Sequence, residues 1–478
     1  MSEAALDAVQ AALGGKRAWI VGGALRDALL RRPVADVDVA LPAEEVKGAA
    51  KALGRAVRGP SFELSGEFGA WRVIGPDRAF QVDLAPLQGE TIEDDLARRD
   101  FTVNAMARRV GSGDGAEGLI DPHGGARDLA AQRLRMVAPR AFDDDPLRVL
   151  RLARFASELP LTPDAETLAE AAARAPRITT VAAERVFAEL KRVIAADRVL
   201  DGLELMATLG LTEHVLPELT ALQGVAQNRY HHLDVHDHTL EVLAETVALE
   251  LAPEAVLGDD ALTERLRGYL GRPFSDELTR GAALRFGALL HDAAKPETQA
   301  FHDDGTVLGF PGHADLGADV ARAVLARLKA SEKLRAHVAL LARHHLGLGY
   351  LVHKAPLDRR TIHTYLTRTS PVEVDVSLLS IADRLATRGR KAEEAIAKHL
   401  DVASVVLPLA LDFADWRAQP PLVRGDELAR ALDTRPGPQI GALLAEIDAA
   451  RYAGEVVTPD EAIALARRVA ASAPSSSP

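Results

Sequence analysis

The sequence contains no cysteine, and this absence excludes several kinds of chemistry at once. Among its 478 residues there is no thiol to form a disulfide, act as a nucleophile or bind zinc. Any metal ion must therefore bind to histidine, aspartate or glutamate. There is also no run of 18 apolar residues, and the first ten residues, MSEAALDAVQ, show no basic region followed by an apolar stretch. We therefore expect neither a membrane span nor a secretory signal, and we expect a cytoplasmic protein.

An excess of positive charge is missing as well. The net charge of -12 argues against a protein that coats nucleic acid through its overall field, although an acidic chain can still carry a local basic surface. Apolar residues make up 47% and charged residues 26%, as in globular proteins. The length predicts three or four domains.

The pattern of apolar residues changes along the chain. Short segments rich in valine, isoleucine and aromatics predict strands at 17–21, 35–41, 70–74 and 79–84, with helices at 23–31 and 43–53 between them. From Asp145 onward the spacing is helical, through 145–157, 164–174, 182–195 and 201–210. The expected fold class is α+β, with a mixed sheet and helices in a head, followed by an all-α remainder.

Four regions follow from this pattern. We expect the head at 1–137, a helical neck at 138–227, a histidine-rich region at 228–395 and a helical C-terminal segment at 396–478. The last residues, ASAPSSSP, predict a disordered tail.

Two aspartates occupy alternate positions of an apolar strand, in the stretch ADVDVAL. Alternate residues of a strand face the same side, so Asp36 and Asp38 share one face while Val37 and Val39 enter the core. Two carboxylates this close repel each other unless a cation lies between them, and Mg²⁺ prefers oxygen ligands. An edge strand with a solvated face is the alternative for this pattern taken alone.

A glycine pair precedes the aspartates, in GGALRD. Gly22 and Gly23, between a strand and a helix, let backbone amides approach a phosphate, and Arg26 adds a charge-assisted contact. An ordinary glycine turn is the alternative.

Together these stretches resemble the signature of the nucleotidyltransferases that contain class II tRNA CCA-adding enzymes and bacterial poly(A) polymerases. Further similar motifs follow in the family's order: RRDFTVNAMA (98–107), DPHGGARDL (121–129), DDDPLRVLRLARFASEL (143–159) and ERVFAELKRVI (184–194). The resemblance covers residues 17 to about 215. It implies that Asp36 and Asp38 hold Mg²⁺, that Gly23 and Arg26 contact the triphosphate, and that Arg99 reaches the incoming nucleotide.

The resemblance also implies which residues choose the base. The family pattern Glu-Asp-x-x-Arg is matched by Asp144, Asp145 and Arg148, with aspartate in place of the first glutamate. A carboxylate accepts from an exocyclic amine and an arginine donates to ring acceptors, a combination that suits cytosine and adenine and not uracil or guanine. Arg151 and Arg154 continue the spacing of three as a basic stripe suited to a triphosphate, with a solvated helix face as the alternative.

One departure concerns the product. Full CCA-adding members commonly carry a long, flexible loop after the strand equivalent to QVDLAPL, whereas here only QGET precedes IEDDLARRD. This short connection resembles enzymes that add two cytidines and stop. Asp83 in that strand is either a third acid near the metal ions or a plain polar residue.

Most of the 15 histidines lie in the third region, where the pattern resembles HD-domain metal phosphohydrolases. The resemblance implies one metal ion on His238, His291, Asp292 and Asp383. His313, with His344 or His345, would support a second. The alternative is a scaffold that holds the tRNA elbow.

The main hypothesis is a template-independent nucleotidyltransferase that adds CMP and/or AMP from CTP and ATP to the 3′ end of tRNA. The alternatives are a poly(A) polymerase, an HD-domain phosphohydrolase with a degenerate head, and a non-catalytic RNA-binding protein.

Overall fold

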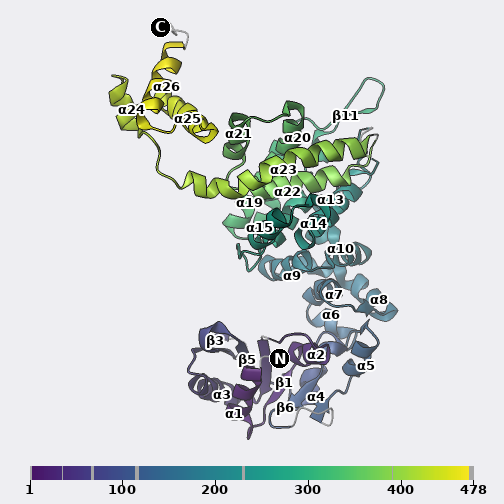
Figure 1. The fold of residues 1–478 in the computed structure, drawn as a ribbon. Helices are drawn as coiled ribbons and strands as arrows, with labels where there is room; N and C mark the ends of the chain where they lie inside the picture. Colours follow the sequence, from purple (N-terminus) through teal and green to yellow (C-terminus); the bar gives the residue numbers. More distant parts are fainter. Residues whose placement is uncertain are drawn as a thin grey trace. The chain divides into compact units, whose positions relative to one another are not determined.

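The computed structural model describes residues 3–34, 36–65, 69–112, 118–228, 232–389 and 391–472 (Figure 1). The chain forms two compact units, Met1–Val215 and Leu216–Pro478. Within the described ranges, no helix is both long and apolar enough to cross a membrane. Ala35, at the start of an expected strand, and residues 473–478 of the expected tail lie outside these ranges.

The first unit begins with a mixed sheet of seven strands. Their order is β3-β4-β5-β2-β1-β6-β7, and β2 pairs with β5 in parallel while the other described neighbours are antiparallel. The strands are β1 (Trp19–Val21), β2 (Asp36–Leu41), β3 (Ser61–Ser65), β4 (Ala70–Ile74), β5 (Gln81–Pro86), β6 (Ala107–Arg109) and β7 (Leu119–Ile120). The four predicted strands are therefore present, near their expected bounds.

Three strands of this sheet, β3, β6 and β7, and the first helix were not among the predicted elements. β6 and β7 are too short to show a period, and β3 exposes its apolar side chains Phe62 and Leu64 instead of burying them. Helix α1 (Glu3–Leu13) packs beside α3 (Ala43–Ala56), and both contribute to the core under the sheet.

The helical neck follows in the same unit. The helices are α2 (Gly23–Leu29) and α4 (Ile92–Leu96) in the head, then α5 (Gly125–Ala130), α6 (Arg140–Asp144), α7 (Leu147–Glu158), α8 (Ala165–Arg174), α9 (Ala183–Ala195), α10 (Val199–Thr208) and α11 (Thr212–Val215). The four predicted neck helices match α7 to α10. Leu150, Leu152 and Phe155 of α7 are buried, and the helix packs against α9 and α10.

The second unit is almost wholly helical. Its helices are α12 (Pro217–Thr220), α13 (Val235–Leu251), α14 (Glu254–Leu257), α15 (Asp260–Leu270), α16 (Arg280–Leu290), α17 (Lys295–Thr298), α18 (His313–Arg327), α19 (Glu332–His344), α20 (Gly347–Leu351), α21 (Arg359–Thr369), α22 (Glu373–Ala386), α23 (Ala392–Arg417), α24 (Gly425–Ala431), α25 (Pro438–Ala453) and α26 (Pro459–Ser472). Helix α13 packs on α16 and α22, and α16 also contacts α19. These four helices surround most of the histidines discussed below.

One expected boundary, between residues 395 and 396, falls inside α23. Val402, Val406 and Phe413 of this helix are buried, and α23 packs along α22. The helix continues across the expected boundary because its apolar residues keep the helical spacing there. The division of the chain into four regions otherwise stays a prediction.

Candidate active site and candidate metal centre

The two aspartates of β2 lie on the exposed face of the strand. Val37 and Val39 are buried between them in the head core, as the alternation predicts. In the parallel pairing of β2 with β5, Asp38 lies directly beside Asp83, which accepts a two-pronged ion pair from Arg72 at 2.7 and 2.8 Å. Three carboxylates therefore occupy neighbouring positions on one face of the sheet.

The environment of Asp38 disfavours its negative charge. Surrounding protein atoms displace water from the carboxylate, although part of its surface is accessible, and this raises its pKa above 3.8. The carboxylates of Asp83 and Asp36 add to the rise, while Arg99 opposes it. Several carboxylate oxygens lie close together here, with too little positive charge around them to balance theirs. Such a group is a suitable set of ligands for a hard divalent cation.

The glycine turn brings the backbone close to this face. Val21 pairs with Asp38, and Gly22 follows with a φ of 70°, a left-handed conformation that favours glycine. A β-carbon on Gly22 would lie 2.8 Å from Nη1 of Arg99 and 3.7 Å from Oδ2 of Asp38. Any larger residue would therefore disturb the space between Arg99 and the carboxylate.

Arg99 connects two cavities of the first unit. A cavity of about 270 Å³ is lined by Asp38 and Asp83, and one of about 400 Å³ is lined by Asp145 and Arg151; Arg99 and Arg148 line both. Nε and Nη2 of Arg99 donate to Asp95, at 3.1 and 2.9 Å, which fixes the guanidinium. Asp38 and the predicted base-selecting Asp145 thus line different cavities that have Arg99 and Arg148 in common.

Asp145 and Arg148 lie at the junction of α6 and α7. Asp145 accepts from the backbone N–H of Leu147 at 3.2 Å and from Arg185 of α9 at 2.7 Å. Arg148 donates to the backbone carbonyls of Ala141 and Arg98, at 3.2 and 2.7 Å. Both side chains are thus held before any nucleotide arrives.

The other predicted nucleotide-binding arginines make internal contacts. Arg151 donates to Oδ2 of Asp100 at 2.5 and 2.8 Å and lies in the larger cavity. Arg154 is buried, 4% exposed, and forms an ion pair of 2.8 Å with Glu189. The two residues therefore do not form one accessible stripe, because α7 turns Arg154 toward α9.

Arg26 is also internal, and it reveals residues that sequence reasoning missed. It forms a two-pronged pair with Asp27 and donates to Oδ1 of Asn104 at 2.7 Å, and Asn104 donates to Asp100 at 3.1 Å. Asn104 and Glu189 lie inside the quoted motifs RRDFTVNAMA and ERVFAELKRVI. Their motifs were a usable signal, but nothing in the spacing indicated their partners.

The short connection before the second motif is held by side chains. The backbone N–H of Gln88 donates to Asp95 at 3.0 Å, and Thr91 and Asp94 cap α4 reciprocally. The connection is therefore a capped turn in place of a long loop.

In the second unit, the predicted ligands of the HD pattern come together from α13, α18, α22 and the ends of α16 and α19. Nε2 of His238 lies 3.0 Å from Asp383 and 3.8 Å from Asp292. Nε2 of His291 lies 3.1 Å from the same Asp292 carboxylate. Lys295 also contacts Asp292, at 2.6 Å.

His345, and not His344, completes the second set. Nε2 of His345 lies 3.8 Å from Oδ1 of Asp292 and 3.3 Å from Nε2 of His313, which is 3.5 Å from the same oxygen. His344 lines a neighbouring pocket. Asp292 thus lies between two groups of ligands.

Hydrogen bonds set the tautomers of three of these histidines. Nδ1 of His291, His313 and His345 each lie 2.7 to 2.8 Å from a backbone carbonyl oxygen, which can only accept. Nδ1 must therefore carry a proton, so Nε2 is the ring nitrogen that the neutral imidazole offers to a metal ion. Among the described residues, Oδ1 of Asp292 is buried and has no hydrogen-bond partner. This arrangement fits one or two divalent metal ions.

Comparisons with known proteins agree with the order of these sites. Three family models match: "Poly A polymerase head domain" at residues 18–135, "Probable RNA and SrmB-binding site of polymerase A" at 161–223 and "HD domain" at 235–388. An A-adding tRNA nucleotidyltransferase of Deinococcus radiodurans is 35% identical, over 96% of this chain and 97% of its own length. A CC-adding tRNA nucleotidyltransferase of Thermus thermophilus is 33% identical, over 94% and 93%.

Other relatives extend the comparison. A multifunctional CCA protein of Xanthomonas campestris is 32% identical, over 89% of this chain and 96% of its own length. Among solved structures, a CCA-adding enzyme in an apo form has a TM-score of 0.63 at 18% identity, covering 99% of this chain and 94% of that one. A Thermotoga maritima CCA-adding enzyme complexed with tRNA has a TM-score of 0.59 at 17% identity, covering 98% and 96%. At these identities the structures show a shared fold alone.

Proposed function

Since the chain belongs to the family of tRNA nucleotidyltransferases, we propose that it transfers CMP or AMP from CTP or ATP to the 3′ end of a tRNA without a nucleic-acid template. The observation that carries this proposal is the pair of cavities that share Arg99 and Arg148. One is lined by the β2 carboxylate Asp38 and the other by Asp145. A triphosphate and its base can therefore occupy adjoining spaces.

In this proposal Asp36 and Asp38 hold Mg²⁺, with Asp83 beside them. Bound there, the metal ions supply charge stabilisation for an in-line displacement at the α-phosphorus. Gly22 leaves room for a phosphate next to Arg99, whose guanidinium adds positive charge. Arg26 is buried and does not contact the phosphate in this proposal. It positions the surrounding residues through its contacts with Asp27 and Asn104.

Asp145 and Arg148 choose the base. The Asp145 carboxylate accepts from the exocyclic amine of cytosine or adenine, and the Arg148 guanidinium donates to the neighbouring ring acceptor. Arg185 and the two backbone carbonyls hold these side chains, so that the protein replaces a template strand.

The short, capped connection at residues 88–91 favours addition of two cytidines without the final adenosine. The relatives do not select one product, because they include an A-adding, a CC-adding and a multifunctional CCA enzyme.

The experiment supplies Mg²⁺ and three tRNA substrates, ending before the CCA sequence, after one C and after CC. Each receives CTP, ATP or both, and the products are sized. Two added cytidines and no adenosine support the CC-adding product. AMP added only to the CC-ending tRNA, or a complete CCA, rejects that product but keeps the transfer proposal. A long adenosine tail would instead support a poly(A) polymerase.

The HD cluster of the second unit is a proposed metal site. We propose that His238, His291, Asp292 and Asp383 hold a divalent metal ion, with His313 and His345 available to a second. The converging Nε2 atoms of the histidines and the buried Oδ1 of Asp292, which has no hydrogen-bond partner among the described residues, support this. The cytoplasmic location expected from the sequence is also part of the proposal.

A further inference from the structure

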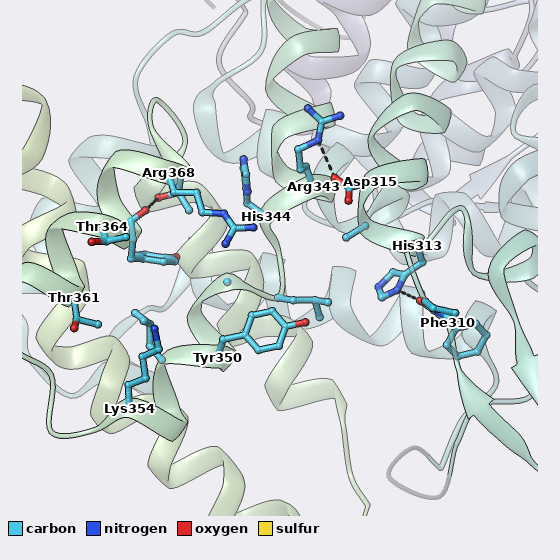
Figure 2. A pocket seen from close by; sticks show the side chains of 18 of the residues that line it. Phe310, His313, Asp315, Arg343, His344, Tyr350, Lys354, Thr361, Thr364 and Arg368 are labelled. Atoms are coloured by element: carbon cyan, nitrogen blue, oxygen red, sulfur yellow. Dashed lines mark hydrogen bonds and ion pairs between the residues drawn. The ribbon is translucent and has the colours of Figure 1, made fainter. Parts of the chain in front are cut away.

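An aromatic side chain at the edge of the head sheet takes no part in the two candidate sites. Phe62 lies in β3, the outermost strand in the sheet order, and is 41% exposed. It lines neither of the two cavities that share Arg99. It is also separate from the pocket beside the histidine and aspartate cluster, shown in Figure 2, because that pocket lies wholly in the second unit. The ring is therefore an exposed aromatic group outside both sites.

The strand register puts Phe62 on the face of the sheet that carries the β2 carboxylates. Asp38 lies beside Asp83 of β5, and Asp83 lies beside Arg72 of β4. Arg72 in turn pairs directly with Phe62. Residues directly opposite each other in neighbouring strands point to the same face. The four side chains therefore form one row, which runs from Asp38 over three strand spacings, or about 14 Å, to Phe62.

The opposite face of these strands is the covered one. Val73 and Val82 alternate with the row and are buried in the head core. Helix α3 contributes to that core and packs on β3, β4 and β5 (Figure 1). Along the row itself, the side chains of Arg72 and Asp83 are 30% and 27% exposed. A ligand can therefore reach the row from the carboxylates to the edge of the sheet.

Arg72 supplies positive charge next to the exposed ring. Its Nε and Nη2 donate to Asp83, whereas Nη1 has no hydrogen-bond partner among the residues that the structure describes. Proteins bind single-stranded nucleic acid with this combination, in which cationic groups follow the backbone and bases stack on aromatic rings. Stacking does not read the edge of a base. It therefore suits an RNA whose last base changes each time a nucleotide is added.

The geometry of the transfer reaction places the RNA on the same side. Gly22 and Arg99, which contact the triphosphate in the proposed function, lie on the β1 side of Asp38. Strand β5 lies on the other side of β2. In an in-line displacement the attacking oxygen and the leaving pyrophosphate lie on opposite sides of the phosphorus. Since the triphosphate extends toward Arg99, the acceptor hydroxyl arrives from the β5 side, where the row begins.

We propose that the row from Asp83 to Phe62 holds the acceptor end of the RNA, with one of its last two bases stacked on the Phe62 ring. The inference rests on the proposed transfer reaction and adds the surface that receives the RNA. Phe62 contacts the RNA but not the reacting atoms. Its loss should therefore raise KM for the RNA and leave KM for the nucleotide unchanged.

Steady-state transfer by the full-length chain tests this, with the tRNA end and the nucleotide that the parent chain uses. Phe62→Ala and Phe62→Leu should both raise KM for the tRNA by at least about fivefold, because the stacked ring is lost. Phe62→Leu separates stacking from strand packing, since leucine keeps an apolar side chain on β3. Phe62→Tyr keeps the ring and should retain the parent KM.

Glu63→Ala is the matched control. Glu63 is exposed in the same strand but pairs with Trp71, which packs against the core on the covered face. This substitution should leave KM for the tRNA unchanged. Among the tRNA ends that the parent extends, those that differ in their last base should show the same loss in Phe62→Leu, because stacking tolerates every base.

The outcomes separate this inference from the proposed function. If the parent transfers nucleotides and both Phe62→Ala and Phe62→Leu keep its KM for the tRNA, the inference is wrong and the proposed function stands. An equal rise in Glu63→Ala, or a rise in Phe62→Tyr as large as in Phe62→Leu, would also overturn it. A parent chain that extends no tRNA refutes the proposed function, and this inference with it.

Discussion

Nη1 of Arg26 donates a 2.7 Å hydrogen bond to Oδ1 of Asn104, and this buried contact joins the helix after the glycine turn to the second motif. Asn104 in turn donates to Asp100, which accepts from Arg151 of α7. One continuous polar network therefore connects α2 with α7, the helix that carries Arg148. Asn104, Asp100 and Arg151 also line the larger cavity, so this network fixes part of the cavity wall.

Replacing Asn104 by alanine should cost about 1 to 3 kcal/mol of stability, because buried hydrogen-bonding groups of Arg26 and Asp100 lose their partner. Unfolding in urea can be followed for the head alone in a Trp416→Phe background, which leaves Trp19 and Trp71, both in the first unit. Gln10→Ala, on an exposed position of α1, is the matched control and should change stability by less than about 0.5 kcal/mol. Equal effects of the two substitutions would contradict the network.

Asp100 should make the head sensitive to acid. Burial alone would raise its pKa, but Arg151 and the hydrogen bonds from Asn104 and the Phe101 N–H lower it from 3.8 to about 2. A lowered pKa in the folded state contributes stability that is complete above pH 3.8 and is lost as the pH falls toward 2. The contribution is about 2 kcal/mol.

The advantage of the parent chain over Asp100→Asn should therefore shrink by about 1 kcal/mol between pH 6 and pH 3. The same tryptophan background measures it by urea unfolding at both values. A difference in stability that stays constant over this range would show that Asp100 is not held as a paired carboxylate.

Replacing Arg148 by alanine should reduce base discrimination. We expect kcat/KM for the accepted nucleotide to fall by about tenfold, with a smaller loss for UTP, because one of the two base contacts disappears. Arg177→Ala is the matched control, since this arginine pairs with Asp143 at the surface and lines neither cavity. If the ratio of CTP to UTP incorporation is unchanged in Arg148→Ala, the arginine does not choose the base.

Metal analysis tests the second unit. Purified full-length chain should retain a divalent metal ion, and His291→Ala should lose it, because the buried Nε2 lone pair is removed. His353→Ala, an exposed histidine of the same unit, should keep the metal content of the parent. Equal metal content in both variants would argue against the cluster as a ligand set.

Much of the candidate active site was predictable because its signals are local. The alternation of Asp36 and Asp38 with buried valines fixes which carboxylates share the exposed face of β2, and this follows from strand geometry alone. The helical spacing of α7 to α10 was equally clear. The HD ligands could be named from motifs, but the choice of His345 over His344 depends on which side of α19 faces Asp292.

The rest depends on tertiary pairing. Arg151 and Arg154 look alike in sequence, yet one reaches a cavity and the other is buried against Glu189, because α9 covers part of α7. For Asp83 the sequence left open a third acid near the metal ions or a plain polar residue, and only the strand register places it beside Asp38. The periodicity of apolar residues also could not locate short strands such as β6 or give the full length of α23.

In the proposed function the β2 carboxylates, and not the HD cluster, support the transfer. The most direct measurement compares single-turnover incorporation of CMP or AMP into tRNA by the parent chain, Asp38→Asn and Asp383→Asn. We expect Asp38→Asn to be slower by at least about 100-fold, with a stability equal to or above the parent because carboxylate repulsion is relieved, and Asp383→Asn to keep the parent rate. Transfer that survives in Asp38→Asn, or is lost in a folded Asp383→Asn alone, would show that the β2 carboxylates do not support the reaction.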